Sequence, residues 1–266
     1  MKNFTCRGIH YQDQGDPKKL PIILIHGMTF DHNMWNPQIK VLKKNYRVIA
    51  YDMRGHGLSK VYDGQYTYRM FADDLKDLMD HLDIEQAVLC GLSMGGAVAL
   101  RTYELYPERV RALVLSDTRS EADSNETKEW RENSIDSIKK NGLKPFTDGF
   151  LADTFAEESF KTNPEGVKLI RSTVLRTDPL AVCGVLLAQA ARTDMTHILQ
   201  KIDVPTLIMI GENDRFTPLS SSRTMNQNIP GSELKIIGKA GHISNLENTP
   251  EFNKNITEFL EKLDLI

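Results

Sequence analysis

Short apolar runs that alternate with helix-forming segments limit the fold of this chain more than any other feature. Six runs rich in Val, Ile and Leu are expected to form strands: 21–25, 47–51, 87–90, 112–115, 206–210 and 234–237. Their nearly continuous apolar character is typical of strands that are buried on both faces. The alternation predicts an α/β fold, in which helices flank a mostly parallel central sheet.

Two of the intervening segments have the spacing of amphipathic helices. The first carries apolar residues at intervals that place them on one helix face: Phe71, Leu75, Leu78, Met79 and Leu82. We expect this helix to cover the sheet. The closing segment 250–262 repeats the pattern, and Pro250 suits the first turn of a helix. This second helix is expected to dock on the core.

The stretch 119–200 interrupts the alternation, because it contains helix formers with scattered apolar positions and no strong strand pattern. We therefore predict a core made of residues 1–118 and 201–266, with a helical cap of residues 119–200 inserted in it. The very polar start of the cap, 121–129, is interpreted as a solvated helix face or loop. The apolar portion 180–191 is expected to lie over either the core or a substrate pocket.

The sequence Gly91-Leu92-Ser93-Met94-Gly95 lies between the third apolar run and a helix-like segment. A strand-to-helix turn this tight strains the central residue, and side chains at the glycines would collide with neighbouring backbone. Ser93 is therefore the candidate nucleophile, and the N–H of Met94 is a candidate donor to an oxyanion near a helix N-terminus. A glycine-rich turn with an incidental serine is the alternative, and the flanking strand and helix argue against it.

His26-Gly27-Met28 follows the first apolar run directly. Acyl transfer usually needs two backbone donors for the developing oxyanion, and a turn after this strand can supply the second from the N–H of Met28. We interpret His26 as a structural residue that holds this loop, rather than as the catalytic base.

Two further candidates follow the last two predicted strands, where a parallel sheet presents side chains at its carboxyl edge. These are Asp214 and His242. Along the chain, Ser93, Asp214 and His242 follow the order nucleophile, acid, base, which is the order in one known scaffold for serine catalytic triads. His242 would accept the Ser93 proton, and Asp214 would fix the tautomer of the His242 ring. Because only neutral imidazole can accept a proton, activity should rise with pH along an ionisation near pH 6.5. Asp117, also just past a strand end, is the alternative acid, but we expect it to cap or brace the entry to the cap.

These motifs, together with the segment 52–59, resemble the α/β-hydrolase superfamily over nearly the whole chain outside the cap. Within it, segments 116–123 and 240–247 are similar to carboxylesterases and 3-oxoadipate enol-lactonase-like hydrolases. The resemblance implies that neither a metal nor an organic cofactor is needed, and the sequence offers no ligand cluster for one. We assign 52–59 to structure, with Arg54 and His56 as packing or hydrogen-bonding residues.

Charge and cysteine content restrict the partners. The net charge of −3 comes from interspersed acids and bases, which makes nucleic acid and membrane surfaces unfavourable partners. The three cysteines, Cys6, Cys90 and Cys183, lie too far apart in sequence for a disulfide framework or a zinc motif. We expect Cys90 and Cys183 to be buried, and the protein to be soluble and cytoplasmic.

The predicted function is hydrolysis of a small-molecule carboxylic ester, with a small or medium acyl group, or of a lactone, through an acyl-enzyme. Alternatives are a 3-oxoadipate enol-lactonase-type hydrolase, a cofactor-free perhydrolase, and a ligand receptor with residual hydrolase activity. Dehalogenases related to this fold use an Asp nucleophile, and Ser93 excludes that chemistry. The sequence leaves the substrate and the oligomeric state open.

Overall fold

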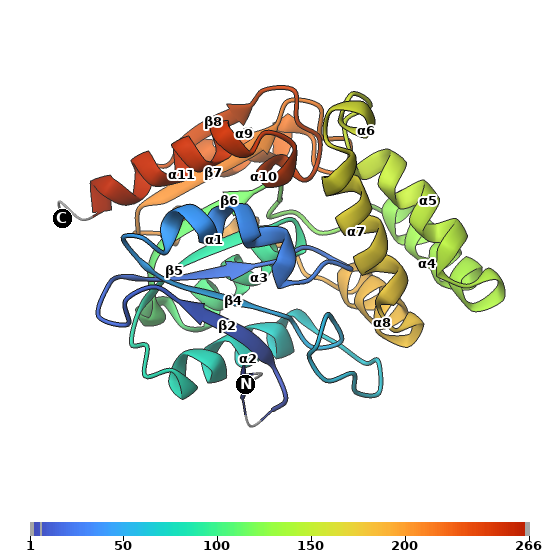
Figure 1. The fold of residues 1–266 in the computed structure, drawn as a ribbon, viewed down its shortest axis with the longest axis horizontal. Helices are drawn as coiled ribbons and strands as arrows, with labels where there is room; N and C mark the ends of the chain where they lie inside the picture. The colour runs from blue at the N-terminus through green and yellow to red at the C-terminus, as the bar shows by residue number, and fades with distance from the viewer. Residues whose placement is uncertain (1–2, 6, 264–266) are drawn as a thin grey trace.

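Each of the six predicted strand segments forms a strand in the computed structural model, which describes residues 3–5 and 7–263. The strands join in one sheet with the order β1-β2-β4-β3-β5-β6-β7-β8 (Figure 1). Their bounds are β1 (Asn3–Phe4), β2 (His10–Gln14), β3 (Pro21–Ile25), β4 (Arg47–Tyr51), β5 (Ala87–Leu92), β6 (Val110–Ser116), β7 (Thr206–Gly211) and β8 (Glu233–Ile237). The predicted α/β fold with a mostly parallel sheet is confirmed.

The strands from β4 across to β8 pair in parallel, whereas β1 and β2 are antiparallel additions at one edge. No pattern in the sequence predicts β1 or β2. The expectation that β8 is buried on both faces is wrong: β8 is the other edge strand, and Ile236 is 45% exposed. β3, between β4 and β5, marks the point where strand order reverses, and ligands bind open α/β sheets at such points.

Helices cover both faces of the sheet. They are α1 (Asn36–Leu42), α2 (Tyr68–His81), α3 (Met94–Leu105), α9 (Leu219–Asn228), α10 (Ser244–Glu247) and α11 (Thr249–Leu263), with 3-10 turns η1 (His32–Trp35), η2 (Pro107–Arg109) and η3 (Thr196–Lys201). The two predicted helices are present as α2 and α11. α2 begins at Tyr68 because the Thr67 side chain accepts a hydrogen bond from Met70 N–H and caps it. α1 packs against α11, and α2 against α3 (Figure 1).

Between β6 and β7 lies the helical insertion, which consists of α4 (Asn125–Asn141), α5 (Leu143–Thr154), α6 (Ser159–Thr162), α7 (Pro164–Arg176) and α8 (Pro179–Ala190). Figure 1 shows these helices grouped at one side of the molecule, beyond the sheet. On α8, Val182 is buried but Leu187 is 57% exposed. The segment before α4 is not solvated throughout, because Asp123 is buried. That part of the prediction for 121–129 is wrong.

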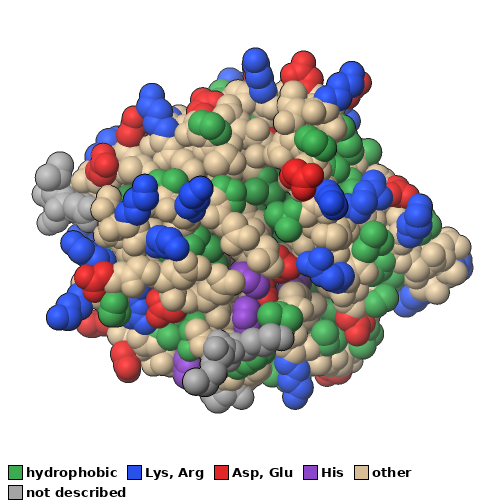
Figure 2. Space-filling model, in the orientation of Figure 1, with side chains coloured by type: hydrophobic (Ala, Val, Ile, Leu, Met, Phe, Trp, Pro, Cys, Tyr) green, Lys and Arg blue, Asp and Glu red, His purple; other side chains and the backbone are tan. Residues whose placement is uncertain are grey.

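Three observations concern the rest of the chain. In residues 3–5 and 7–263 no helix is long and apolar enough to cross a membrane. Cys90 and Cys183 are free and buried, as predicted, whereas Cys6 lies outside the described residues. Figure 2 shows acidic and basic side chains interspersed across the visible face, in line with the pattern in the sequence.

Candidate active site

Ser93 occupies a strained turn between β5 and α3. Its backbone angles are φ 57° and ψ −118°, a conformation in which residues other than glycine are rare. Added Cβ atoms would lie 2.2 Å from the Gly95 carbonyl oxygen at Gly91, and 2.2 Å from the Ile25 carbonyl oxygen at Gly95. Only glycine fits at these two positions, so the motif Gly91-x-Ser93-x-Gly95 is required by the packing of strand, turn and helix.

The structure brings Ser93, His242 and Asp214 into one hydrogen-bonded chain. His242 Nε2 lies 2.8 Å from Ser93 Oγ, and His242 Nδ1 lies 2.9 Å from Asp214 Oδ2. Because a carboxylate oxygen accepts, Nδ1 carries the proton and Nε2 is left to accept the serine proton. Burial by itself lowers the pKa of His242, but the charge and hydrogen bond of Asp214, with the nearby carboxyl groups of Asp117 and Glu247, outweigh burial and raise that pKa above its ordinary value. These three hydrogen-bonded side chains can therefore move a proton from the serine hydroxyl to the imidazole.

Backbone donors hold Asp214 in place, since its Oδ1 accepts hydrogen bonds from the N–H groups of Phe216 at 2.8 Å and Thr217 at 3.0 Å. The His242 N–H donates to the Thr154 carbonyl oxygen at 2.8 Å, which links the histidine loop to α5 of the helical insertion. No motif in the sequence predicts a role for these groups. Backbone contacts of this kind leave no pattern in a sequence.

Glu247 is a second residue whose role the sequence does not predict. Its carboxylate accepts from Gly241 N–H at 2.9 Å, from Ala156 N–H at 2.8 Å and from the Ser159 hydroxyl at 2.6 Å. It thus ties the loop before His242 to the helical insertion. The only signal in the sequence was an acidic residue shortly after the glycine and histidine of Gly241-His242.

Asp117, the alternative acid, is fully buried and makes no hydrogen bond to His242 among the described contacts. Its carboxylate accepts from Gly211 N–H at 2.8 Å and from the Ser244 hydroxyl at 2.5 Å. Asp117 directly follows β6, where the chain leaves the core, so these contacts brace the entry to the helical insertion against β7 and α10, as expected. Burial, with the nearby Asp214 charge, raises its pKa well above the ordinary value.

The turn after β3 lies beside Ser93, since a Cβ added at Gly27 would be 3.4 Å from Ser93 Cβ. Met28 and Met94 both line the cavity at Ser93. As the first residue of α3, Met94 has one of the N–H groups for which an α-helix provides no acceptor. The two backbone segments expected to supply oxyanion donors therefore meet at the same serine.

His26 holds this turn, in agreement with its structural interpretation. Its Nε2 accepts from Met53 N–H at 2.9 Å, so Nδ1 carries the proton and donates to the Gly27 carbonyl oxygen at 2.7 Å. Complete burial, aided by the neighbouring His56, lowers the pKa of His26 to about 3, and the ring is neutral. Both ring nitrogens are used.

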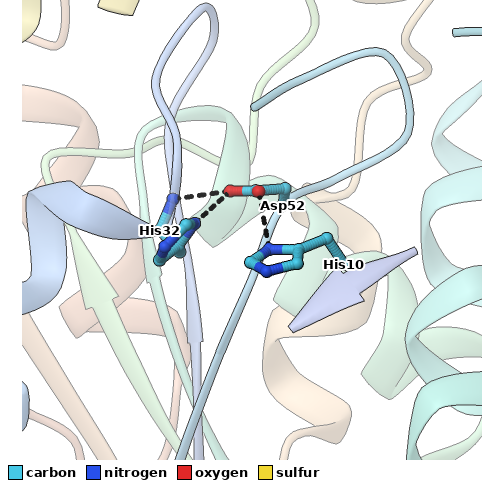
Figure 3. A group of neighbouring side chains, drawn as sticks. All are labelled: His10, His32 and Asp52. Carbon is cyan, nitrogen blue, oxygen red and sulfur yellow. Dashed lines mark hydrogen bonds and ion pairs between the residues drawn. The ribbon is translucent and has the colours of Figure 1, made fainter. Parts of the chain in front are cut away.

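Behind the turn, Asp52 joins β2, η1 and β4 through two histidines (Figure 3). Asp52 Oδ2 accepts from His10 Nδ1 at 3.0 Å, and Oδ1 accepts from His32 Nδ1 at 2.7 Å. In the described part of the chain this trio is the one group of His, Cys, Asp or Glu side chains close enough to hold a metal. Backbone N–H groups of His32 and Leu58 also bond to the carboxylate, which makes the cluster a hydrogen-bonding centre of the fold.

Arg54 and His56 also serve the structure, as predicted. Arg54 donates twice to the buried Asp74 carboxylate, from Nε and Nη2, each at 2.6 Å. His56 Nδ1 donates to the Arg54 carbonyl oxygen at 3.0 Å. The segment 52–59 is thereby fixed against α2.

A cavity of about 330 Å³ opens over Ser93 and His242. Part of its wall is apolar and aromatic, formed by Met28, Phe30, Trp130, Phe150 and Phe216. Another part is basic and polar, formed by Arg119, Arg131, Gln189 and Arg192. The helical insertion contributes Trp130, Arg131, Phe150 and Gln189 to this lining. The insertion therefore shapes the space in which a substrate of Ser93 would lie.

The chain is similar to known proteins over nearly its whole length. A family model described as "alpha/beta hydrolase fold" matches residues 21–249. The chain is 29% identical to 3-oxoadipate enol-lactonase 1 of Acinetobacter baylyi, over 99% of this chain and 97% of the relative. It is 34% identical to non-heme chloroperoxidase CPO-A1 of Kitasatospora aureofaciens, over 96% of each. A thermophilic esterase from Thermogutta terrifontis, solved with malate bound, matches with a TM-score of 0.93 and 33% identity, over 99% of this chain and 98% of the esterase.

Proposed function

The chain belongs to the α/β-hydrolase family, and from this premise we propose that it hydrolyses carboxylic esters or lactones through an acyl-enzyme on Ser93. One observation carries the proposal. Hydrogen bonds join Ser93 Oγ to His242 Nε2 and His242 Nδ1 to Asp214, and these three side chains lie at a cavity of about 330 Å³. A serine hydroxyl is a poor nucleophile at neutral pH, and this arrangement activates it.

In the proposed reaction, Ser93 Oγ attacks the ester carbonyl carbon while its proton passes to His242 Nε2. The carbonyl oxygen becomes an oxyanion, which the N–H groups of Met28 and Met94 stabilise. His242 then gives the proton to the leaving oxygen as the carbon–oxygen bond breaks and the acyl-enzyme remains. Water, activated by the same histidine, attacks the acyl carbon and releases the acid and free Ser93. Asp214 stabilises the imidazolium in both halves.

The size and lining of the cavity support small or medium substrates. A volume of about 330 Å³ is near the lower end of the usual range for ligand sites, roughly 300–1,000 Å³. Phe150 and Phe216 lie 5.5 Å apart between ring centroids, and Phe216 lies 5.1 Å from His242. In this proposal the stretch 119–200 acts as a cap that brings Trp130 and Phe150 over the acyl-enzyme. The enol-lactonase and esterase relatives support the same class.

Perhydrolysis is a second candidate, which the 34% identity to a non-heme chloroperoxidase favours. Hydrogen peroxide would replace water as the attacking group, so that the acyl-enzyme yields a peracid instead of an acid. The triad and the oxyanion donors would serve both reactions. Peracid formation from acetate and hydrogen peroxide, measured beside ester hydrolysis by the same preparation, separates the two activities.

Esters of graded acyl length and a panel of lactones, tested with wild type and Ser93→Ala, examine the proposal. We expect hydrolysis by wild type and a loss of several orders of magnitude in the variant, because only oxyanion and binding effects remain. Circular dichroism should show that both proteins are folded. Equal turnover by the variant, or no turnover of any member of the panel by wild type, would exclude the proposal, and the second result would favour a ligand receptor.

A further inference from the structure

Three arginine side chains that line the cavity over Ser93 converge on one carboxylate. Asp123 accepts hydrogen bonds from Arg131 Nε at 2.5 Å, Arg119 Nη2 at 2.7 Å and Arg192 Nη2 at 3.2 Å. The Asp123 side chain is fully buried, and those of Arg131 and Arg192 are only 8% and 4% exposed. The cavity wall thus contains charged groups that are almost entirely removed from water.

The charges of this cluster do not balance, since three guanidinium groups meet a single carboxylate. Burial by itself raises the pKa of Asp123, but the hydrogen bond and the charges of the arginines outweigh it and lower that pKa, so the carboxylate is ionised. The acidic side chains that line the cavity, Glu126 and Asp153, are exposed, as is Arg215. Unbalanced positive charge in a buried wall attracts an anion more strongly than a charge at the surface does.

Arg192 is held in this wall by its neighbours. Its Nη2 donates to Asp123 at 3.2 Å and to the Glu121 carbonyl oxygen at 2.7 Å, and its guanidinium lies 5.8 Å from the centroid of the Tyr68 ring. The positive charge of Arg192 is therefore fixed in position in the lining of the cavity.

Arg131 connects this wall to the reacting centre. Its Nη2 donates to Gln189 Oε1 at 3.2 Å, and Gln189 Nε2 lies 2.9 Å from the sulfur of Met28, the residue of the turn beside Ser93. Because Ser93, Arg131 and Arg192 line the same cavity, a molecule that fills it can contact an arginine at one end while its carbonyl group lies at Ser93.

From these contacts we propose that the substrate is an ester or lactone that carries a second, anionic group such as a carboxylate, and that Arg131 and Arg192 bind this group. The inference rests on the proposed function, because it names the substrate class of the same site. A cluster that only pinned the helical insertion to the core would give no preference between charged and neutral substrates of equal shape.

Monoethyl glutarate and its carboxamide isostere, ethyl 5-amino-5-oxopentanoate, form a matched pair for the test, with turnover followed by pH-stat titration. Wild type should favour the carboxylate in kcat/KM by on the order of tenfold to a hundredfold, the range for hydrogen bonds to a charged group. The same preference should appear in inhibition of 4-nitrophenyl acetate hydrolysis by glutarate and by glutaramide, which needs no variant.

Arg192→Gln should reduce the preference for the carboxylate about tenfold, mainly through KM, and Arg192→Lys should restore part of it because the charge is kept. Arg111→Gln removes the same charge from an exposed position at the start of β6 and should retain the wild-type preference. Ser93-dependent turnover with equal kcat/KM for the two esters would overturn the inference and leave the proposed function standing. If other esters of the panel were hydrolysed but neither glutarate ester was, the inference alone would be overturned, whereas absence of Ser93-dependent turnover across the whole panel would overturn both.

Discussion

Replacing Asp214 by Asn tests which carboxylate works with His242. In the structure, Oδ1 of Asp214 accepts from the N–H groups of Phe216 and Thr217, and Oδ2 lies 2.9 Å from His242 Nδ1. An asparagine would keep its oxygen at the two N–H donors, and its NH₂ group would then face Nδ1. The imidazole proton must move to Nε2, which can no longer accept the proton of Ser93. A tautomer change of this kind in a serine triad costs about 10⁴-fold in kcat, which is about 5.4 kcal/mol.

Asp117→Asn is the matched comparison. Asp117 bonds to Gly211 N–H and to the Ser244 hydroxyl, and an asparagine can accept from the first and donate to the second. Burial already favours the uncharged form of this side chain. We therefore expect a loss of less than about tenfold in kcat. The assay is steady-state hydrolysis of 4-nitrophenyl acetate, with circular dichroism to verify folding. If Asp117→Asn lost more activity than Asp214→Asn, the assignment of the acid would be refuted.

Three further predictions follow from the same contacts. His242→Ala should abolish acylation, whereas His26→Ala should retain measurable turnover because His26 only holds the Gly27 turn; single-turnover kinetics would show the reverse if the roles were exchanged. The rise of wild-type kcat/KM with pH should have its midpoint above 6.5, since the raised pKa of His242 keeps the inactive, protonated imidazole to higher pH; a midpoint below 6.5 in a pH–rate profile would contradict this. Glu247→Gln should lower the free energy of unfolding, measured in urea titrations, by about 1–3 kcal/mol, because the new NH₂ group would face the N–H donor of Gly241 or of Ala156. The control Glu258→Gln, at an exposed position, should change the free energy of unfolding by less than about 0.5 kcal/mol. Equal effects of the two substitutions would refute the role of Glu247.

The parallel strands could be predicted because each is a local apolar run. β2 could not, because its sequence His10–Gln14 is largely polar and its strand character comes from pairing with β4, far along the chain. The apolar run at β8 was misjudged for the opposite reason: its composition does not reveal that it lies at an edge of the sheet. Sheet position is a tertiary property, and composition alone is a weak guide to it.

The same distinction holds at the candidate site. Ser93, Asp214 and His242 could be named because each stands in a short motif at a strand end. Asp123 could not be recognised as buried, since the arginines that neutralise it include Arg192, which is brought to it by the packing of α4 against α8. A polar segment looks solvated in sequence until the helices around it are placed.

Covalent labelling tests most directly whether Ser93 is the nucleophile. Wild type would be treated with a fluorophosphonate probe, digested and mapped by mass spectrometry, beside Ser93→Ala and Asp117→Asn. The account predicts one adduct, on the peptide that contains Ser93, in wild type and Asp117→Asn, and none in Ser93→Ala. An adduct on another serine, or labelling of Ser93→Ala at the wild-type rate, would contradict it.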